Sequence, residues 1–245
     1  QNPWMNLIPE IERSGASGRV NYILNDYATA FVHTTYRKLK THYEMAPTPA
    51  FGDRNIDTWG MLPSSNPFNP FGDSTDWAKL SKTKRGEAVS FNHRFVEIGP
   101  RLFDIQSEVF RVIPGVKFDI GDSWQAEAAF LYNKVESIVF GRNFVFTDAL
   151  KEALSSSDPA TAYNIFGSGP GINSASVLDS LRISTLRRAE SEFRMFDVKA
   201  AGDLYELPGG TLALAVGVET AKEETSDIGD ALSMANKIVA SGGTS

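Results

Sequence analysis

The residues that could do chemistry are scattered along the chain rather than grouped. None of the histidines stands at the short spacing that places two metal ligands on one helical face. If His33 and His42 share a strand, they lie on opposite faces and about 30 Å apart. Neither of these two nor His93 predicts a metal site, and no cofactor is expected.

Carboxylates are plentiful, but no pair is distinguished as a general acid and a general base. The chain has no cysteine, and no Gly-x-Ser-x-Gly elbow marks a serine nucleophile. We therefore expect a protein that is not an enzyme. Four carboxylates are interpreted as charges near turns or on the wet side of a sheet: Asp197, Asp203, Glu206 and Glu219.

Two loop motifs stand out. Residues 167–171 are rich in glycine but lack the Lys-Ser/Thr ending of a phosphate-binding loop, so they predict only a flexible loop. Residues 66–72 read Asn-Pro-Phe-Asn-Pro-Phe-Gly, and residues 164–167 echo the second half of that run. Asx turns anchored by phenylalanines explain this pattern. The functional alternative is contact with a ligand through Phe68, Phe71 and Phe166.

Bulk composition limits the class of protein further. The net charge is −6 and the pI is near 5.2, without a long run of Lys or Arg, so no nucleic-acid partner is expected. No stretch approaches the roughly 20 consecutive apolar residues of a membrane-spanning helix. The first residues show neither the basic region nor the apolar core of a signal peptide.

The elements that carry these residues read as strands, because apolar side chains recur at every second position. In residues 211–219, aliphatic residues share one face, while small or charged residues share the other. Residues 196–204 alternate in the same way, and residues 207–210 (Leu-Pro-Gly-Gly) predict a hairpin turn between the two. The aliphatic positions of the later strand are Leu212, Leu214, Val216 and Val218.

A second hairpin is predicted from residues 110–120 and 124–133, with Gly121-Asp122 as its turn. Pro114 weakens this prediction, because proline donates no hydrogen bond to a strand ladder. The large apolar residues that share a face in this hairpin are Phe110, Val112, Phe118 and Phe130.

A third hairpin pairs residues 19–24 with residues 28–36 across Asn25-Asp26. Its facing is ambiguous, because Phe31 is out of phase with Val32. Hairpin counting gives about six strands in all.

Short turns alternate with two long connections, residues 45–87 and 144–188, which are rich in Pro, Gly, Ser and Asn. Compact soluble domains seldom contain structureless loops beyond about 15 residues, whereas outer-membrane barrels combine short periplasmic turns with long extracellular loops. A short helix is predicted at residues 147–156, as a decoration of the loop. Residues 89–98 are interpreted as an extension of the strand that follows them, with a break at Gly99-Pro100.

Alternation alone leaves two architectures open. A membrane barrel places its aliphatic face against lipid, and a soluble sandwich buries the same face between two sheets. Aromatic residues near the expected strand ends fit either an interface girdle or ordinary strand formers. These aromatic residues are Tyr22, Tyr36, Trp124, Tyr132 and Tyr205.

Two stretches carry a resemblance to a known family. Residues 202–210 (GDLYELPGG), running on into residues 212–219 (LALAVGVE), resemble a hairpin in the barrel domain of TonB-dependent outer-membrane receptors. Residues 66–72, followed by residues 94–101 (RFVEIGPR), are similar to a second stretch of the same proteins. The resemblance covers most of the chain and implies an all-β antiparallel up-and-down meander, part of a transmembrane β-barrel with long extracellular loops.

The resemblance also implies a function. Receptors of this family import ferric siderophores, cobalamin or oligosaccharides through a barrel that an N-terminal plug closes, and the TonB protein energises uptake. Because no signal peptide, plug, TonB-contacting peptide or terminal aromatic strand is visible, residues 1–245 are expected to be an internal fragment of the barrel domain. The implied partners are the outer-membrane bilayer, the TonB complex through the missing plug, and a small-molecule or oligosaccharide ligand.

About six strands, against the roughly 22 of a plugged transporter, would not close such a barrel alone. The alternative function is a soluble secreted β-sandwich that binds carbohydrate. In the barrel, the lipid-facing residues would be Phe110, Val112, Phe118, Phe130, Leu212, Leu214, Val216 and Val218.

Overall fold

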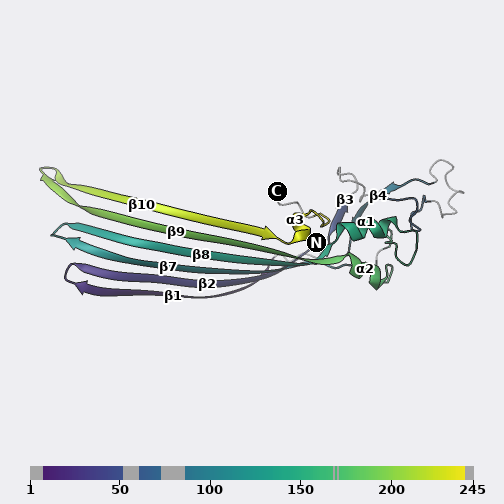
Figure 1. Ribbon diagram of the computed structural model, residues 1–245, viewed down its shortest axis with the longest axis horizontal. Coiled ribbons are helices and arrows are strands. Elements are labelled where there is room, and N and C mark those ends of the chain that lie inside the picture. The colour runs from purple at the N-terminus through teal and green to yellow at the C-terminus, as the bar shows by residue number, and fades with distance from the viewer. Residues whose placement is uncertain (1–7, 52–60, 73–85, 168, 170, 241–245) are drawn as a thin grey trace.

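The dominant feature of the computed structural model, which describes residues 8–51, 61–72, 86–167, 169 and 171–240, is one long antiparallel sheet (Figure 1). Its strand order is β1-β2-β7-β8-β9-β10, so the predicted up-and-down meander is confirmed. The sheet is open, with β1 and β10 as its outer strands, and does not close into a barrel. Its strands are β1 (Glu10–Asn25), β2 (Ala28–Met45), β7 (Arg101–Ile120), β8 (Trp124–Val145), β9 (Arg182–Leu207) and β10 (Gly210–Gly229).

Parts of three sequence interpretations lie outside the described residues. Ser168 and Pro170 of the glycine-rich run are among them, as are residues 52–60 and 73–85 of the first long connection. The interpretations of the chain's two ends rest on residues 1–7 and 241–245, which are also outside.

All three predicted hairpins are present, but their strands are much longer than the alternation indicated. At the first turn, Asn25 Oδ1 accepts a hydrogen bond from the backbone N–H of Tyr27 (3.1 Å). From such turns the strands run on for between 16 and 26 residues. Alternation revealed only the half of each strand nearest the turn, because both faces carry charged side chains in the other half.

One bulge changes the facing at the turn end of β9. Leu212 pairs with Tyr205 and Ala213 with Asp203, which makes Leu204 the extra residue. The alternation in the sequence had placed Leu204 on the same face as Phe196 and Val198. The bulge instead brings Tyr205 opposite Leu212.

Pro114 is accommodated within β7. It pairs with Val32 of β2, while the ladder to β8 skips Ile113 and Pro114, because proline has no N–H to donate. Phe31, whose facing was ambiguous, pairs with Gly115 and is buried. A Cβ on Gly115 would lie 2.3 Å from the ring of Phe31, so glycine makes room for it on the face opposite Val32.

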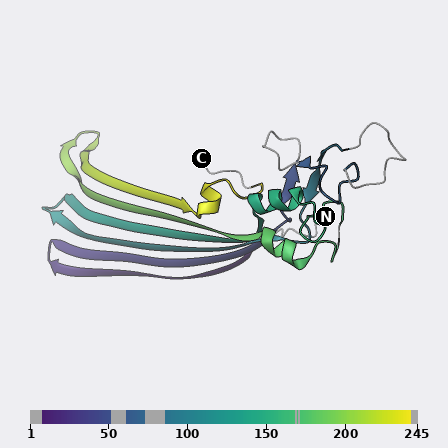
Figure 2. The same ribbon diagram turned by 45° about the vertical axis from the view of Figure 1, so that its right-hand side comes forward.

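The described parts of the long connections fold into a cap at the end of the sheet farthest from the hairpin turns (Figures 1 and 2). They are therefore not structureless loops. The cap contains β3 (Pro49–Phe51) paired with β6 (Asn92–Arg94), β4 (Met61–Leu62) paired with β5 (Val89–Ser90), and the helices α1 (Thr147–Ser155) and α2 (Ala175–Leu181).

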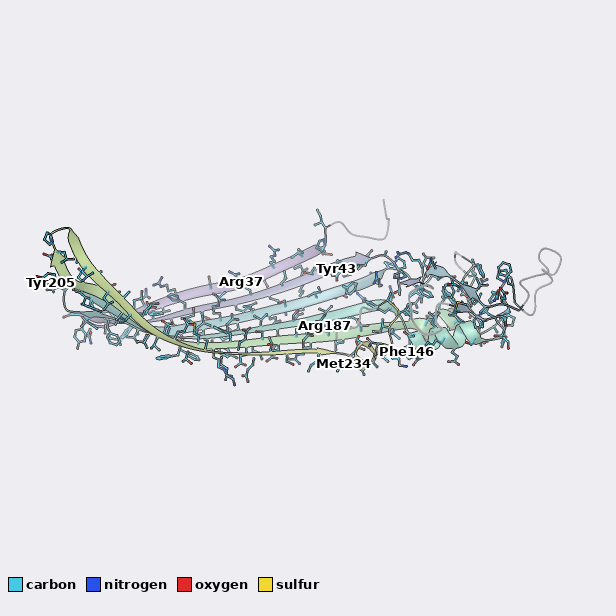
Figure 3. The ribbon with its side chains drawn as sticks, turned by 90° about the horizontal axis from the view of Figure 1, so that it is seen from above. Arg37, Tyr43, Phe146, Arg187, Tyr205 and Met234 are labelled. Carbon is cyan, nitrogen blue, oxygen red and sulfur yellow. The ribbon has the colours of Figure 1, made fainter. Side chains whose placement is uncertain are left out.

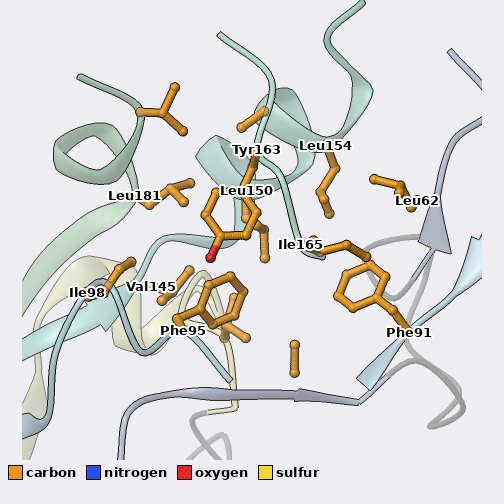
Figure 4. Close-up of a cluster of buried hydrophobic side chains, with 14 residues drawn as sticks. Leu62, Phe91, Phe95, Ile98, Val145, Leu150, Leu154, Tyr163, Ile165 and Leu181 are labelled. Carbon is orange, nitrogen blue, oxygen red and sulfur yellow. The ribbon is translucent and has the colours of Figure 1, made fainter. Parts of the chain in front are cut away.

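The hydrophobic core of the protein lies in this cap (Figure 4). The predicted helix is confirmed as α1, but its interpretation as a decoration was wrong, because Leu150 and Leu154 are buried in the core. Residues 89–98 are not an extension of β7 either. They form β5, β6 and a turn that brings Phe95 and Ile98 into the core. The break at Gly99, whose φ is +94°, is confirmed.

The segment after β10 returns to the cap. Asp230 caps the short helix α3 (Ala231–Met234), and its carboxylate accepts hydrogen bonds from the N–H groups of Leu232 and Ser233. The N–H of Val239 then donates to the carbonyl of Val145 (2.9 Å). This contact ties the far ends of β8 and β10 to the same core.

Candidate functional site

The strand register sorts the side chains of the sheet into two faces. Directly paired residues share a face, so the pairs Val216–Ala200, Ala200–Ala126 and Ala126–Phe118 carry one face across four strands. We call it the aliphatic face and its opposite the polar face. All the candidate lipid-facing residues lie together on the aliphatic face: Phe110, Val112, Phe118, Phe130, Leu212, Leu214, Val216 and Val218.

The apolar residues form a band beside the hairpin turns, which we call the apolar band. It occupies residues 28–36, 110–118, 124–132 and 212–220, and the aliphatic-face positions of these segments carry no charged residue. Nine residues extend over about 27 Å along a strand. Most of the large side chains in the band are exposed, Val218 to 68%, and the described chain lays no second sheet over them (Figure 3).

An aromatic row ends the apolar band. Tyr36 pairs with Phe110, whose ring centroid lies 6.3 Å from that of Tyr132. The sequence predicted the tyrosines of this row near the strand ends. In the structure the row lies in the middle of the strands, because the strands continue well beyond it. The hydroxyl of Tyr36 donates to Glu108 (3.2 Å), on the side away from the band. Trp124, Tyr22 and Tyr205 lie beside the turns.

Beyond the aromatic row the aliphatic face becomes charged. Lys38 Nζ lies 2.7 Å from a carboxylate oxygen of Glu108, and Lys134 Nζ lies 2.7 Å from Glu136 and 3.2 Å from Glu190. These pairs hold cations and carboxylates side by side across several strands. We call the set the charged belt: Lys38, Glu108, Lys134, Glu136, Glu190, Glu192, Arg194, Lys222 and Glu224.

His33 and His42 share one strand, as the sequence analysis supposed. His33 and His42 occupy opposite faces of β2. His42 Nδ1 lies 2.6 Å from Asp104, and Arg142 also donates to this carboxylate. Because His42 and Arg142 both favour its charged form, the pKa of Asp104 lies below its ordinary value.

The polar face carries its own ion pairs beside the turns. Glu127 lies 2.8 Å from Lys199 and 3.3 Å from Lys117. Asp197 and Glu219, which were interpreted as wet-side charges, pair with each other in the register and lie on this face. Within the apolar band, the aliphatic face is therefore uncharged, whereas the polar face of the same strands carries ion pairs.

The Asx-turn interpretation of the loop motifs is confirmed. In each of three turns, an asparagine Oδ1 accepts a hydrogen bond from the backbone N–H two residues later, at 2.9 to 3.0 Å. The echo between the two loops is therefore a repeated turn geometry. The turns are Asn66 to Phe68, Asn69 to Phe71 and Asn164 to Phe166.

Asn66 also brings the two loops together. Its side chain is fully buried and donates to the carbonyls of Leu154 (2.9 Å) and Tyr163 (3.4 Å). Of the candidate ligand-contacting residues, Phe166 is 55% exposed and Phe71 is 40% exposed, whereas Phe68 is half-buried. The three described rings share no ring contact, so the structure exposes two of them without forming a single aromatic site.

A polar pair in the cap core was missed by the sequence analysis. His93 Nε2 lies 3.0 Å from the hydroxyl of Tyr163, and both side chains pack against Phe95. Burial lowers the pKa of His93 and raises the pKa of Tyr163. The two residues are 70 positions apart, so no local spacing signals the pair.

No known protein family, curated protein or solved structure matches this chain. Within the described ranges, no helix combines the length and apolar character needed to cross a membrane. Among the same residues, no group of three or more His, Asp or Glu side chains is placed to hold a metal ion.

Proposed function

We propose that the chain forms part of the wall of a TonB-dependent outer-membrane receptor, with its aliphatic face toward lipid and its polar face toward the lumen. The observation that carries the proposal is the exposed apolar band, about 27 Å long, which an aromatic row and then a charged belt terminate. Outer-membrane barrels carry an outward apolar band about 25 Å tall between aromatic girdles.

Surface energetics support this reading of the band. Contiguous exposed apolar surface is unfavourable in water and marks a place where something else makes contact. The occupied lengths, nine residues on each of four strands, match the 9 to 11 residues of a membrane-crossing strand. A soluble sandwich would bury these side chains, whereas Val216 and Val218 are 52% and 68% exposed.

The charged belt and the cap then lie beyond the lipid. Because charged side chains are costly in hydrocarbon, the ion pairs of Lys38 and Lys134 mark where water begins. Phe71 and Phe166 are exposed on the cap at the far end, where a ligand would be captured. The resemblance suggests a ferric siderophore, cobalamin or an oligosaccharide as that ligand, with uptake energised by TonB.

Spin labelling tests the proposal cleanly, because the chain has no cysteine of its own. Nitroxides placed through Val216→Cys and Val218→Cys, in the complete barrel that the proposal requires and in phospholipid bilayers, are expected to collide with dissolved oxygen. The matched labels at Ala215→Cys and Glu219→Cys, on the polar face of the same strand, are expected to collide with a water-soluble nickel chelate. The same accessibility for both pairs, or the reverse order, would contradict the proposal.

A further inference from the structure

Basic side chains follow one another along the polar face of β1, β2 and β7. Arg19 pairs with His33, and Arg111 pairs with Thr35, which places it diagonally between His33 and Arg37. Arg37 pairs with Gly15, diagonally from Arg13. Such diagonal neighbours are about 7 to 8 Å apart, within reach of long side chains. We call this set the arginine track: Arg13, Arg19, His33, Arg37 and Arg111.

The arginine track lacks the counter-charges found elsewhere on the sheet. No ion pair joins these described arginines to a carboxylate, and none of their paired or diagonal neighbours on the polar face is acidic. Within the described residues, the side chains of Arg19 and Arg111 donate only to the amide oxygens of Asn21 (3.4 Å) and Asn133 (3.2 Å). By contrast, Lys117 and Lys199 on the same face both lie against Glu127.

A groove with the same chemistry lies over this part of the sheet. Its volume is about 650 Å³, its lining residues include Arg13, Arg37, Ser17, Thr35 and Ser107, and none of them is acidic. Gly15 keeps its floor low, because a Cβ there would lie 3.2 Å from the Cγ of Arg37. A little further along the track, His33 Nε2 is buried without a hydrogen-bond partner.

We propose that this groove and the arginine track bind a dissolved oxyanion that carries two or more phosphate or carboxylate groups. Guanidinium groups grip such oxygens in bidentate fashion, and hydroxyl groups add further donors. Neighbouring arginines without counter-ions repel one another, and a bound anion relieves that repulsion. The track extends over about 20 Å from Arg13 to Arg19, which favours several acid groups over one.

The location of the track selects the source of the anion. The track lies on the face opposite the apolar band, so a lipid whose tails contact the band cannot reach it with its headgroup. The inference deepens the proposed function, on which it rests for an open, wet polar face, by assigning an anionic class of solute to the lumen. Rings or rows of Arg and Lys are the usual lining of anion pathways.

Titration of the full chain in neutral detergent micelles with pyrophosphate, and separately with citrate, tests the proposal. The double variant Arg37→Gln/Arg111→Gln is expected to bind at least 10-fold more weakly than the unmodified chain. Arg37→Lys, which keeps the charge but loses the planar fork, should give an intermediate loss. The control is Arg187→Gln, which lies on the same face but pairs with Asp227 and should leave binding unchanged.

A thermal melt separates binding from folding. Pyrophosphate should raise the midpoint of the unmodified chain and of Arg187→Gln, but not that of the double variant. Equal binding by the double variant, or no binding by the unmodified chain, would overturn the proposal. Binding of oligoglutamate without pyrophosphate or citrate would also overturn it and would assign the track to an acidic protein segment. These titrations use no bilayer, so they can fail or succeed independently of the spin-label experiment.

Discussion

At the scale of single residues, neighbouring positions of β10 lie on opposite faces of the sheet. Val216 is at the centre of the apolar band, and Ala215 lies on the polar face of the same strand. In the complete barrel that the proposed function requires, placed in phospholipid vesicles, Val216→Arg is expected to lower the free energy of unfolding by about 2 to 4 kcal/mol, as cations do at a bilayer midplane, and Leu214→Arg should behave alike. Ala215→Arg is the control and should cost much less. Denaturant unfolding measures both, and equal costs would refute the assigned facing.

Alternation is why these residues could be predicted. Where one face is aliphatic and the other small or charged, as from Leu212 to Glu219, a period of two is visible in the sequence. Beyond the aromatic row this pattern is lost, because Lys134 and Glu136 put charges on the face that is apolar in the band. The sequence therefore predicted the facing of residues 110–118, 124–132 and 212–220, left that of residues 28–36 ambiguous, and missed the charged belt.

At the scale of elements, the cap depends on α1. Leu150 and Leu154 project from successive turns of this helix into the core and are almost wholly buried. Leu150→Ala should lower the stability of the cap by about 2 to 5 kcal/mol, the usual cost of a cavity at a buried leucine. Lys151→Ala, at the next position of the same helix, should change the stability of the cap little. Hydrogen exchange at the amide of Tyr163, which bonds to Ala153 in the cap, provides the measurement. Equal exchange in the two variants would argue against a structural role for the helix.

The cap could not be predicted from the sequence for a physical reason. Its strands are two or three residues long, too short to show periodicity, and its core joins residues as distant as Leu62 and Val239. The asparagine turns were predictable because they depend on local bonds, such as that from Phe68 N–H to Asn66. Asn66 Nδ2 also donates to the carbonyls of Leu154 and Tyr163. These bonds depend on tertiary contacts, which no local sequence pattern can predict.

At the scale of the whole molecule, the sheet consists of two zones. The aliphatic face is uncharged in the apolar band and carries charged side chains beyond the aromatic row. On β8, Ala128 and Phe130 lie in the apolar band. Glu136, in the charged belt, and Ile138, two residues further on, lie beyond Tyr132. If the boundary belongs to a bilayer, the environment of a position depends on its level along the strand and not on its own residue type. Ile138 is an apolar residue on the same face but past the charged belt, so it tests whether level along the strand or residue type decides the environment.

We expect spin labels at Ala128→Cys and Phe130→Cys, in bilayers, to be reached by oxygen and shielded from the nickel chelate. Labels at Glu136→Cys and Ile138→Cys should be reached by the chelate, because both positions lie on the watery side of the aromatic row. A gradual change along the strand, or a label at Ile138 that behaves like one at Phe130, would mean that local hydrophobicity decides. In that case, the aromatic row would not mark a membrane surface, and the exposed apolar band would need a protein partner instead of lipid.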